Sequence, residues 1–311
     1  MPLITLFSAP KPFTDAHIAT IQRNAIQSWT LLPDLEVILL GEEIGLAEAA
    51  RELGVMHLPN VARNSDGTPL ISSMFELARE NCKGEFLCII NADIVLMSDF
   101  VQAVMESRSL LLNKREQAPA LQNFVLLSQR WDVDVTQPID FSDGWETSLR
   151  AQVKSMGQLH RPAGSDFFLF PLSSFLEVPA FTIGRAGWDN WMIYHARKNK
   201  WPVIDCTPSL MLIHQNHDYS HLPDGKIHHT HPDTDENIRL AGGQSAVRYT
   251  ILDSTHQLKN HKLTRPAPSR ARLLRALEVG LRKIFFFLPS AWTEDVVRPQ
   301  RWGKRIQKLF K

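Results

Sequence analysis

The first 130 residues alternate between short apolar or β-branched runs and longer amphipathic stretches. This alternation is typical of strand–helix–strand units around a largely parallel sheet, so the fold class that it predicts is α/β. The apolar runs predict strands at 3–8, 35–40, 55–58, 86–90 and 124–128. The amphipathic stretches predict helices at about 15–31, 43–53, 69–82 and 98–112. Thr14 or Asp15 can cap the first helix, and Pro69 suits the first turn of the third.

The pattern is less regular from Asp132 to Leu263, where Pro, Gly, Trp and His crowd between short apolar runs. The segment 264–269 contains two prolines and turns polar and basic, which predicts a linker. We therefore expect a catalytic domain at 1–263 and a separate helical tail at 264–311. Residues 265–311 hold 12 Lys and Arg against 3 Asp and Glu, so the near-neutral total of +1 hides an acidic domain and a basic tail.

The tail also places leucines and phenylalanines at helical spacing among these basic residues, from Ser269 to Lys311. A basic amphipathic helix of this kind can lie in the headgroup region of an anionic membrane. Docking of its apolar stripe on a protein domain explains the same pattern equally well.

Composition limits the class of protein. Three widely spaced cysteines in apolar stretches do not predict a disulfide framework, and the chain opens on a strand pattern with no signal-peptide features. The apolar run 284–289 is far shorter than the ~18 residues of a membrane span. We expect a cytoplasmic protein, peripheral at most on the inner face of the membrane. The acidic domain argues against nucleic acid as a partner, and no Gly-x-Gly-x-x-Gly or Walker motif is present.

The clearest candidate for chemistry is the apolar run 86–90 followed by Asn91-Ala92-Asp93. Ligands of open α/β sheets gather at the carboxyl ends of the strands, so Asp93 can hold Mg²⁺ or Mn²⁺ there. Capping of the next helix is an equally good explanation of this aspartate.

A second candidate is the segment 183–191, in which Trp188 and Trp191 flank Asp189 after a glycine turn. Sugar rings stack on tryptophan faces, and a nearby carboxylate can take the proton of an attacking hydroxyl. The alternative is a helix cap with both tryptophans in the core. Upstream, Asp166 opens an apolar strand and can hold sugar hydroxyls, although Gly-Ser-Asp is also ordinary turn chemistry.

Several of these segments together resemble the GT-A glycosyltransferases, especially the inverting family-two type. The resemblance rests on Ser8-Ala9-Pro10, the loop 64–69, Asn91-Ala92-Asp93 and the segment 187–191. The element Asn-Ala-Asp-Ile at 91–94, with His-Gln-Asn-His-Asp-Tyr at 214–219, also resembles a subgroup named haemolysin-like, a label that gives no chemistry. The resemblance implies a Rossmann-like, mostly parallel sheet flanked by helices that binds a nucleotide diphospho-sugar.

The same resemblance implies roles for single residues. Ser8, Ala9 and Pro10 flank the nucleoside, and Asp66 contacts its base or ribose, although a turn before a helix explains Asp66 equally well without a ligand. Asp93 binds the metal that bridges the diphosphate. Asn91 stands where the family has another Asp and can still hydrogen-bond a donor ribose or a metal-bound water. Asp189 is then the catalytic base. His214 completes the metal shell.

The sequence therefore predicts a hexosyltransferase-type enzyme that uses Mn²⁺ or Mg²⁺, a nucleotide-sugar donor and a glycan or lipid-linked acceptor, with inversion, in glycan or surface polysaccharide synthesis. Two alternatives stay open. Asn91 motivates a non-catalytic protein that binds nucleotide or glycan. The spacing of His214, His217 and Asp218 motivates a histidine–metal hydrolase, although the cysteines of a typical zinc site are missing.

Overall fold

The computed structural model describes residues 2–115, 122–217 and 231–284. The chain divides into two compact units, Met1–Arg265 and Pro266–Lys311. Within the part of the chain that is described, no helix combines the length and the apolar character needed to cross a membrane. The predicted membrane-binding surface of the tail lies mostly outside the described residues; its described portion is α8 (Arg270–Ile284).

The other helices are α1 (Ala16–Thr30), α2 (Leu46–Glu52), α3 (Ile71–Asn81), α4 (Ser98–Arg115), α5 (Trp145–Met156), α6 (Trp188–Lys198) and α7 (Pro232–Leu240). The strands are β1 (Ile4–Ser8), β2 (Leu35–Leu40), β3 (Met56–Leu58), β4 (Phe86–Ile90), β5 (Ile94–Val95), β6 (Val125–Leu127), β7 (Arg130–Val133), β8 (Gln158–Leu159), β9 (Phe167–Pro171), β10 (Val203–Asp205), β11 (Leu212–Gln215), β12 (His256–Lys259) and β13 (Lys262–Thr264).

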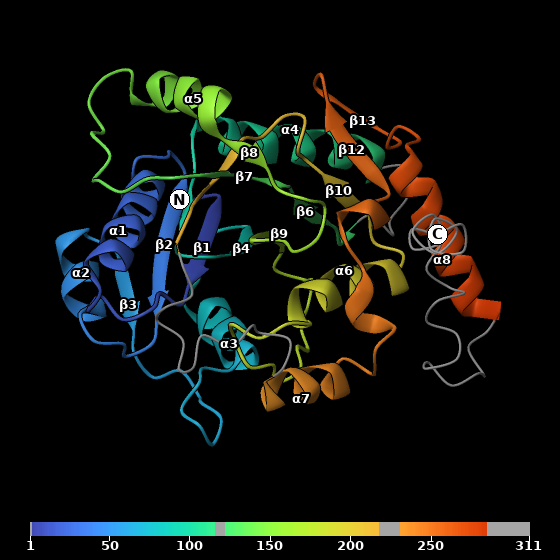
Figure 1. Ribbon diagram of the computed structural model, residues 1–311, viewed down its shortest axis with the longest axis horizontal. Helices are drawn as coiled ribbons and strands as arrows, with labels where there is room; N and C mark the ends of the chain where they lie inside the picture. The colour runs from blue at the N-terminus through green and yellow to red at the C-terminus, as the bar shows by residue number, and fades with distance from the viewer. Residues whose placement is uncertain (1, 116–121, 218–230, 285–311) are drawn as a thin grey trace, which may run out of the picture. The chain divides into compact units, whose positions relative to one another are not determined.

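A nine-stranded sheet in the order β13-β12-β10-β6-β9-β4-β1-β2-β3 forms the centre of the first unit (Figure 1). Most neighbours pair in parallel, as the alternating pattern predicts; the exceptions are β9, which runs antiparallel to both β4 and β6, and the β12–β13 pair. The α/β prediction is therefore confirmed, and the antiparallel β9 is an addition that the local pattern did not indicate.

Both faces of the central strands are covered by helices, which explains their continuous apolar runs. In β4, Cys88 and Ile90 face a cluster that includes Trp29 of α1 and Phe100 of α4. Ile89, which points to the opposite face, joins the cluster that contains Phe75 of α3. The sheet is thus the middle layer of a three-layer sandwich.

A second sheet of four short strands, in the order β5-β11-β7-β8, lies at the edge of this core. Helix α5 covers it with Leu149 and Val153, which pack with Val133 and Ile213. The strand register of this sheet determines which side chains surround His214. Strand β11 runs between β5 and β7, so His214 is paired with Ile94 on one side and with Asp132 on the other.

Of the two predicted helix starts, one is confirmed and the other needs correction. Helix α1 is capped by Asp15, whose carboxylate accepts a hydrogen bond from the backbone N–H of Ile18, as one of the two predicted caps. Pro69, however, is not in the first turn of α3. It lies in a short bridge with Arg63, and the helix begins only at Ile71.

Candidate active site

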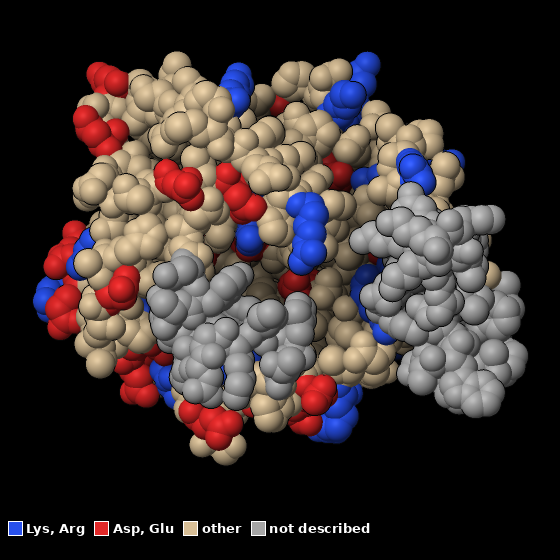
Figure 2. Space-filling model, in the orientation of Figure 1, with Lys and Arg blue, Asp and Glu red and all other residues tan. Residues whose placement is uncertain are grey.

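One cleft, with a volume of about 600 Å³, opens at the carboxyl ends of β1 and β4. The segment that ends β1, the segment that ends β4 and the start of α6 form its walls. In Figure 2 acidic and basic side chains gather around a hollow near the middle of the face that is drawn. The charged and imidazole side chains that line the cleft are Lys11, Glu43, Asp93, Arg130, Arg161, Asp166, Arg185, Asp189, His214 and His217.

Asp93, His214 and His217 meet in the cleft, and the atoms with which they could bind a metal ion lie within 4.8 Å of one another. The pairing of β11 with β5 brings His214 beside Ile94, the residue after Asp93. The Nε2 atoms of His217 and His214 lie 3.2 and 3.8 Å from Oδ2 of Asp93. His214 and His217, which are far from Asp93 in sequence, thus reach its carboxylate because β11 of the second sheet ends beside it.

The electrostatics of this group suit a divalent cation. Burial by itself would raise the pKa of Asp93, but the hydrogen bond with His217 and the nearby His214 and Lys11 hold that pKa at about 2. Burial lowers the pKa of His214, so its imidazole is neutral and keeps a lone pair for a metal. Oδ1 of Asp93 is buried and has no hydrogen-bond partner among the described residues, which leaves it available as a ligand.

Asp132 is a positioning residue for His214 that the sequence did not indicate. Its Oδ1 lies 3.0 Å from Nδ1 of His214, although the two are not aligned for a hydrogen bond. The same carboxylate also contacts two other side chains: Nδ1 of His160 lies 2.6 Å from it, and Nε of Arg130 lies 2.9 Å from it. A carboxylate behind a ligating imidazole orients the ring and increases its basicity.

We expect Asp132→Asn to weaken Mn²⁺ binding by about 10–100-fold, the usual effect of losing a carboxylate behind a histidine ligand. Calorimetric titration of the full chain with Mn²⁺ measures this directly. Asp143→Asn is a matched control, because the Asp143 side chain is exposed and outside the cleft. Equal Mn²⁺ affinities in the two variants would exclude a positioning role for Asp132.

Asn91 is held by Asp166. The antiparallel pairing of β4 with β9 places Ile90 opposite Phe167, so the residues just beyond this pair also meet. Asn91 Nδ2 donates to Oδ1 of Asp166 at 2.9 Å, and Arg130 binds the same oxygen at 2.5 Å. An amide is required here to donate this bond, because a second carboxylate would repel Asp166. The contact with Asp166 thus gives a structural reason for an asparagine at position 91.

Accordingly, Asn91→Asp should not increase Mn²⁺ affinity, and it should destabilise the fold by about 1–3 kcal/mol, because it replaces a donor by a like charge. Thermal melting of the variant beside Asn91→Ala, which removes the donor without adding charge, separates the two causes. A variant with tighter Mn²⁺ binding and unchanged stability would contradict this explanation of Asn91.

Asp189 lies in the first turn of α6 and lines the cleft. The N-cap of this helix is Gly187, so Asp189 is not the cap. Gly187 has φ +114°, and an added Cβ would contact Val247 at 3.1 Å, which is why a glycine precedes the helix. Burial raises the pKa of Asp189, and the charge of Asp166 adds to the effect. A carboxylate with a raised pKa is a better proton acceptor than an ordinary one.

The two tryptophans of the segment, Trp188 and Trp191, have different surroundings. Trp188 lines the cleft and packs edge-on against Phe168. Trp191 is only 6% exposed, does not line the cleft, and packs against Phe181 and Phe175 in the core. The predicted sugar contact of Trp191 is therefore wrong, because the side chain packs among Phe175 and Phe181 instead of reaching the cleft.

Of the other residues predicted to contact the donor, three line the cleft and one does not. Ser8, Ala9 and Pro10 line the cleft at the end of β1, and the hydroxyl of Ser8 donates to the carbonyl of Ile90 at 2.7 Å. Asp66 is exposed at the tip of a turn and is not among the residues that line the cleft. Its backbone N–H donates to Asn64 Oδ1, which completes an ordinary Asx turn.

The sequence reading missed Lys11, Glu43, Arg130 and Arg161, all of which line the cleft. Lys11 and Glu43 follow β1 and β2 at the carboxyl ends of parallel strands, a position that could have indicated both. Burial lowers the pKa of Lys11 although Asp93 opposes the shift. One carboxylate oxygen of Glu43 is bound by Arg63 at 2.9 Å, and the other is buried without a hydrogen-bond partner among the residues described.

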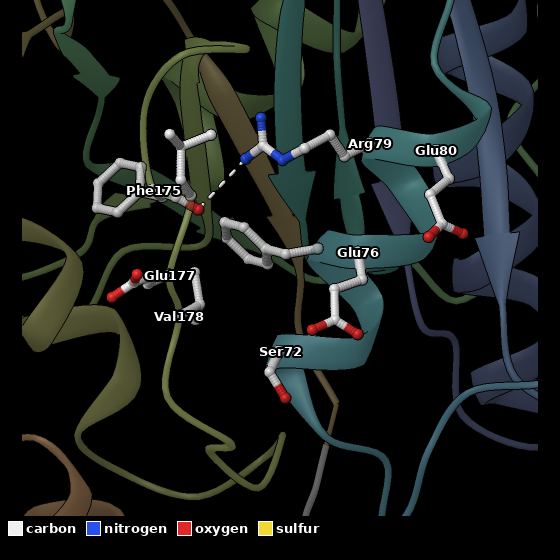
Figure 3. Close-up of a pocket in the computed structure, with 9 residues that line it drawn as sticks. Ser72, Glu76, Arg79, Glu80, Phe175, Glu177 and Val178 are labelled. Atoms are coloured by element: carbon white, nitrogen blue, oxygen red, sulfur yellow. Dashed lines mark hydrogen bonds between the residues drawn. The ribbon is translucent and has the colours of Figure 1, made fainter.

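A smaller hollow of about 360 Å³ lies between α3 and the segment 175–178 (Figure 3). Arg79 reaches across it and donates to the carbonyls of Leu172, Ser174 and Phe175. This arginine is thus used to hold a loop, and the acidic residues around it, Glu76, Glu80 and Glu177, are exposed. The hollow contains none of the residues that the sequence singled out.

No protein-family model matches the chain, and no curated protein does. The fold is similar to solved glycosyltransferase structures at low identity. A mannosyltransferase from Pyrobaculum calidifontis in complex with GDP-Man and Mn²⁺ shows 14% identity and a TM-score of 0.42, over 70% of this chain and 58% of that one. Glucosyl-3-phosphoglycerate synthase from Mycobacterium tuberculosis, in complex with phosphoglyceric acid, shows 13% identity and a TM-score of 0.42, over 80% and 81%. S. aureus TarS shows 11% identity and a TM-score of 0.44, over 78% and 39%.

Proposed function

We propose that this chain is a metal-dependent glycosyltransferase of the GT-A type, which transfers a sugar from a nucleotide-sugar donor to an acceptor hydroxyl. One observation carries the proposal. The group formed by Asp93, His214 and His217 and the carboxylate of Asp189, whose pKa is raised, line the same cleft at the carboxyl ends of the strands. A group that can hold a cation and a separate proton acceptor are what a single displacement at a sugar carbon requires.

The donor end of the cleft is assigned to β1 and β2. Ala9 and Pro10 give an apolar surface for a nucleoside, and the buried, unpartnered oxygen of Glu43 can accept a hydrogen bond from a ribose hydroxyl or a base N–H. Lys11 lies between this end and Asp93, where its ammonium can bind a phosphate oxygen. The diphosphate is therefore expected beside Lys11 and Asp93.

The donor atoms of Asp93, His214 and His217 fit a divalent ion, with Mn²⁺ preferred to Mg²⁺ because Mg²⁺ favours an all-oxygen shell. When bound there, the ion would neutralise charge that develops on the departing diphosphate. In the same reaction, Asp189 accepts the proton of the attacking acceptor hydroxyl, and Trp188 limits the space for the sugar. Attack from the Asp189 side, opposite the diphosphate, inverts the anomeric centre.

A histidine–metal hydrolase remains the second candidate, because two imidazoles and a carboxylate are also a zinc ligand set. Asp218, the third residue of that hypothesis, lies outside the described residues. The argument from Asn91 for a non-catalytic protein is weaker, because the hydrogen bond to Asp166 explains an asparagine at this position without loss of activity.

The test is a thermal-shift screen of nucleoside diphosphates and nucleotide sugars, each with and without Mn²⁺. A ligand that binds only the native state stabilises it by about 2.7 kcal/mol at 100 times its Kd. We expect one nucleoside to raise the melting temperature in a Mn²⁺-dependent manner. A shift with Zn²⁺ alone and none with any nucleotide would exclude the transferase and favour the hydrolase.

A further inference from the structure

The charges that line the cleft are not all paired within the protein. Arg130 binds Asp132 and Asp166, and Lys11 lies beside Asp93. Arg161 differs from both. It is exposed at the cleft, and its side chain has no hydrogen bond or ion pair with residues 2–115, 122–217 or 231–284. A guanidinium at the wall of a cleft, with none of its five donors used, is available to a ligand.

Arg185 is a second cation that lines the cleft, and one ion pair holds it. Its Nε lies 3.6 Å from Oδ2 of Asp233 but has no hydrogen bond among the described residues. Its other contacts, with the carbonyl of Gly184 and with His231 Nε2, are both 3.4 Å long. Arg185 is positioned by its neighbours but not saturated by them.

Both arginines belong to the wall that carries Asp189. Arg161 lies four residues before Ser165, whose backbone N–H binds the Asp189 carboxylate. Arg185 lies four residues before Asp189 itself and lines the same cleft. Lys11 and Asp93 instead follow the ends of β1 and β4. The two arginines therefore come from the segments that carry Asp189 and its hydrogen-bond partner Ser165, and not from the strand ends assigned to the diphosphate.

We propose that Arg161 and Arg185 form an anion-binding subsite for the acceptor, which carries a phosphate or carboxylate group near the attacking hydroxyl. The inference rests on the proposed function, because it assigns the Asp189 side of the cleft to the acceptor. A planar guanidinium binds either anion through two parallel hydrogen bonds, so the two groups share one recognition chemistry. A neutral sugar acceptor would offer these cations hydroxyl oxygens but no charge to neutralise them.

The test is a calorimetric titration of the full chain, loaded with Mn²⁺ and the nucleoside diphosphate from the screen, with glycerol phosphate, glycerate and glycerol. We expect one or both anions to bind and glycerol not to bind. Arg161→Gln and Arg185→Gln should each weaken anion binding by at least about tenfold, and Arg185→Lys should keep part of it. Arg51→Gln, which removes an exposed arginine outside the cleft, should bind like the unaltered chain.

The subsite is refuted if both anions bind no better than glycerol, or if the two cleft variants behave like Arg51→Gln. Mn²⁺ and nucleotide affinities are measured in the same variants, because failure of nucleotide binding in the unaltered chain refutes the proposed function instead. Repeating the titration without nucleotide then still decides whether the arginines bind an anion. A preference for nucleotide-linked uronic acids that disappears in Arg161→Gln would overturn the acceptor assignment in favour of an anionic donor sugar.

Discussion

Asp189→Asn should reduce the transfer rate constant by about 10²–10⁴-fold, the usual contribution of a general base, while Mn²⁺ and donor affinities stay near those of the unaltered chain. An amide keeps the size of the side chain and can still accept the backbone hydrogen bonds of Ser165 and Asn190. It cannot take up the proton of the acceptor. The measurement is single-turnover transfer with the donor identified by thermal shift, beside direct titration of donor binding.

The pKa of Asp189 also predicts the effect of this change on stability. A carboxyl whose pKa is higher in the folded chain than in the unfolded chain favours folding below the unfolded pKa, and this contribution is lost as the pH rises through the folded pKa. At neutral pH the ionised Asp189 is thus unfavourable for folding. Asp189→Asn should therefore melt at the same or a higher temperature than the unaltered chain.

The pH profile of transfer follows from the same shift. Activity should fall as the pH drops through the raised pKa of Asp189, because the protonated carboxyl cannot act as base. Asp143→Asn, an exposed change outside the cleft, should alter neither the rate nor the profile. Loss of donor binding in Asp189→Asn, or an unchanged transfer rate, would remove Asp189 as the base.

Asp93→Asn should weaken Mn²⁺ binding by on the order of 100-fold or more, because it removes the one carboxylate of the ligand group. The amide oxygen can still face His217, so the local shape is preserved while the charge is lost. Nucleotide binding in the presence of Mn²⁺ should weaken in parallel, whereas nucleotide binding without metal should change little. Calorimetry with Mn²⁺, Mg²⁺ and Zn²⁺ gives the three affinities.

The same variant has a stability signature of opposite sign to that of Asp189→Asn. The pKa of Asp93 is lowered to about 2, so its ionised form favours folding above the unfolded pKa, and this contribution is lost as the pH falls toward 2. Without metal, Asp93→Asn should therefore melt below the unaltered chain at neutral pH. Unchanged Mn²⁺ affinity in this variant would refute the metal site, and retained Zn²⁺ affinity with lost Mn²⁺ affinity would favour the hydrolase.

The local pattern was sufficient for the first half of the fold. Strands β1, β2 and β4 lie within one residue of the predicted limits, because each is a short apolar run buried on both faces. The cap at Asp15 and the carboxylate that follows β4 were predicted on the same ground. These features depend on neighbours within a few residues, which the sequence displays directly.

The tertiary structure decided what surrounds those positions. Insertion of β9 antiparallel to β4 brings Asp166 against Asn91, and β11 carries His214 between β5 and Asp132. Such pairings join residues more than 70 positions apart, and no local periodicity encodes them. Two predicted contacts were wrong for more local reasons: an Asx turn leaves Asp66 exposed outside the cleft, and packing against Phe175 and Phe181 buries Trp191. The sequence by itself determined the strands, the helices and the kinds of reactive side chain, whereas long-range pairing and burial decided which of those side chains share a cleft.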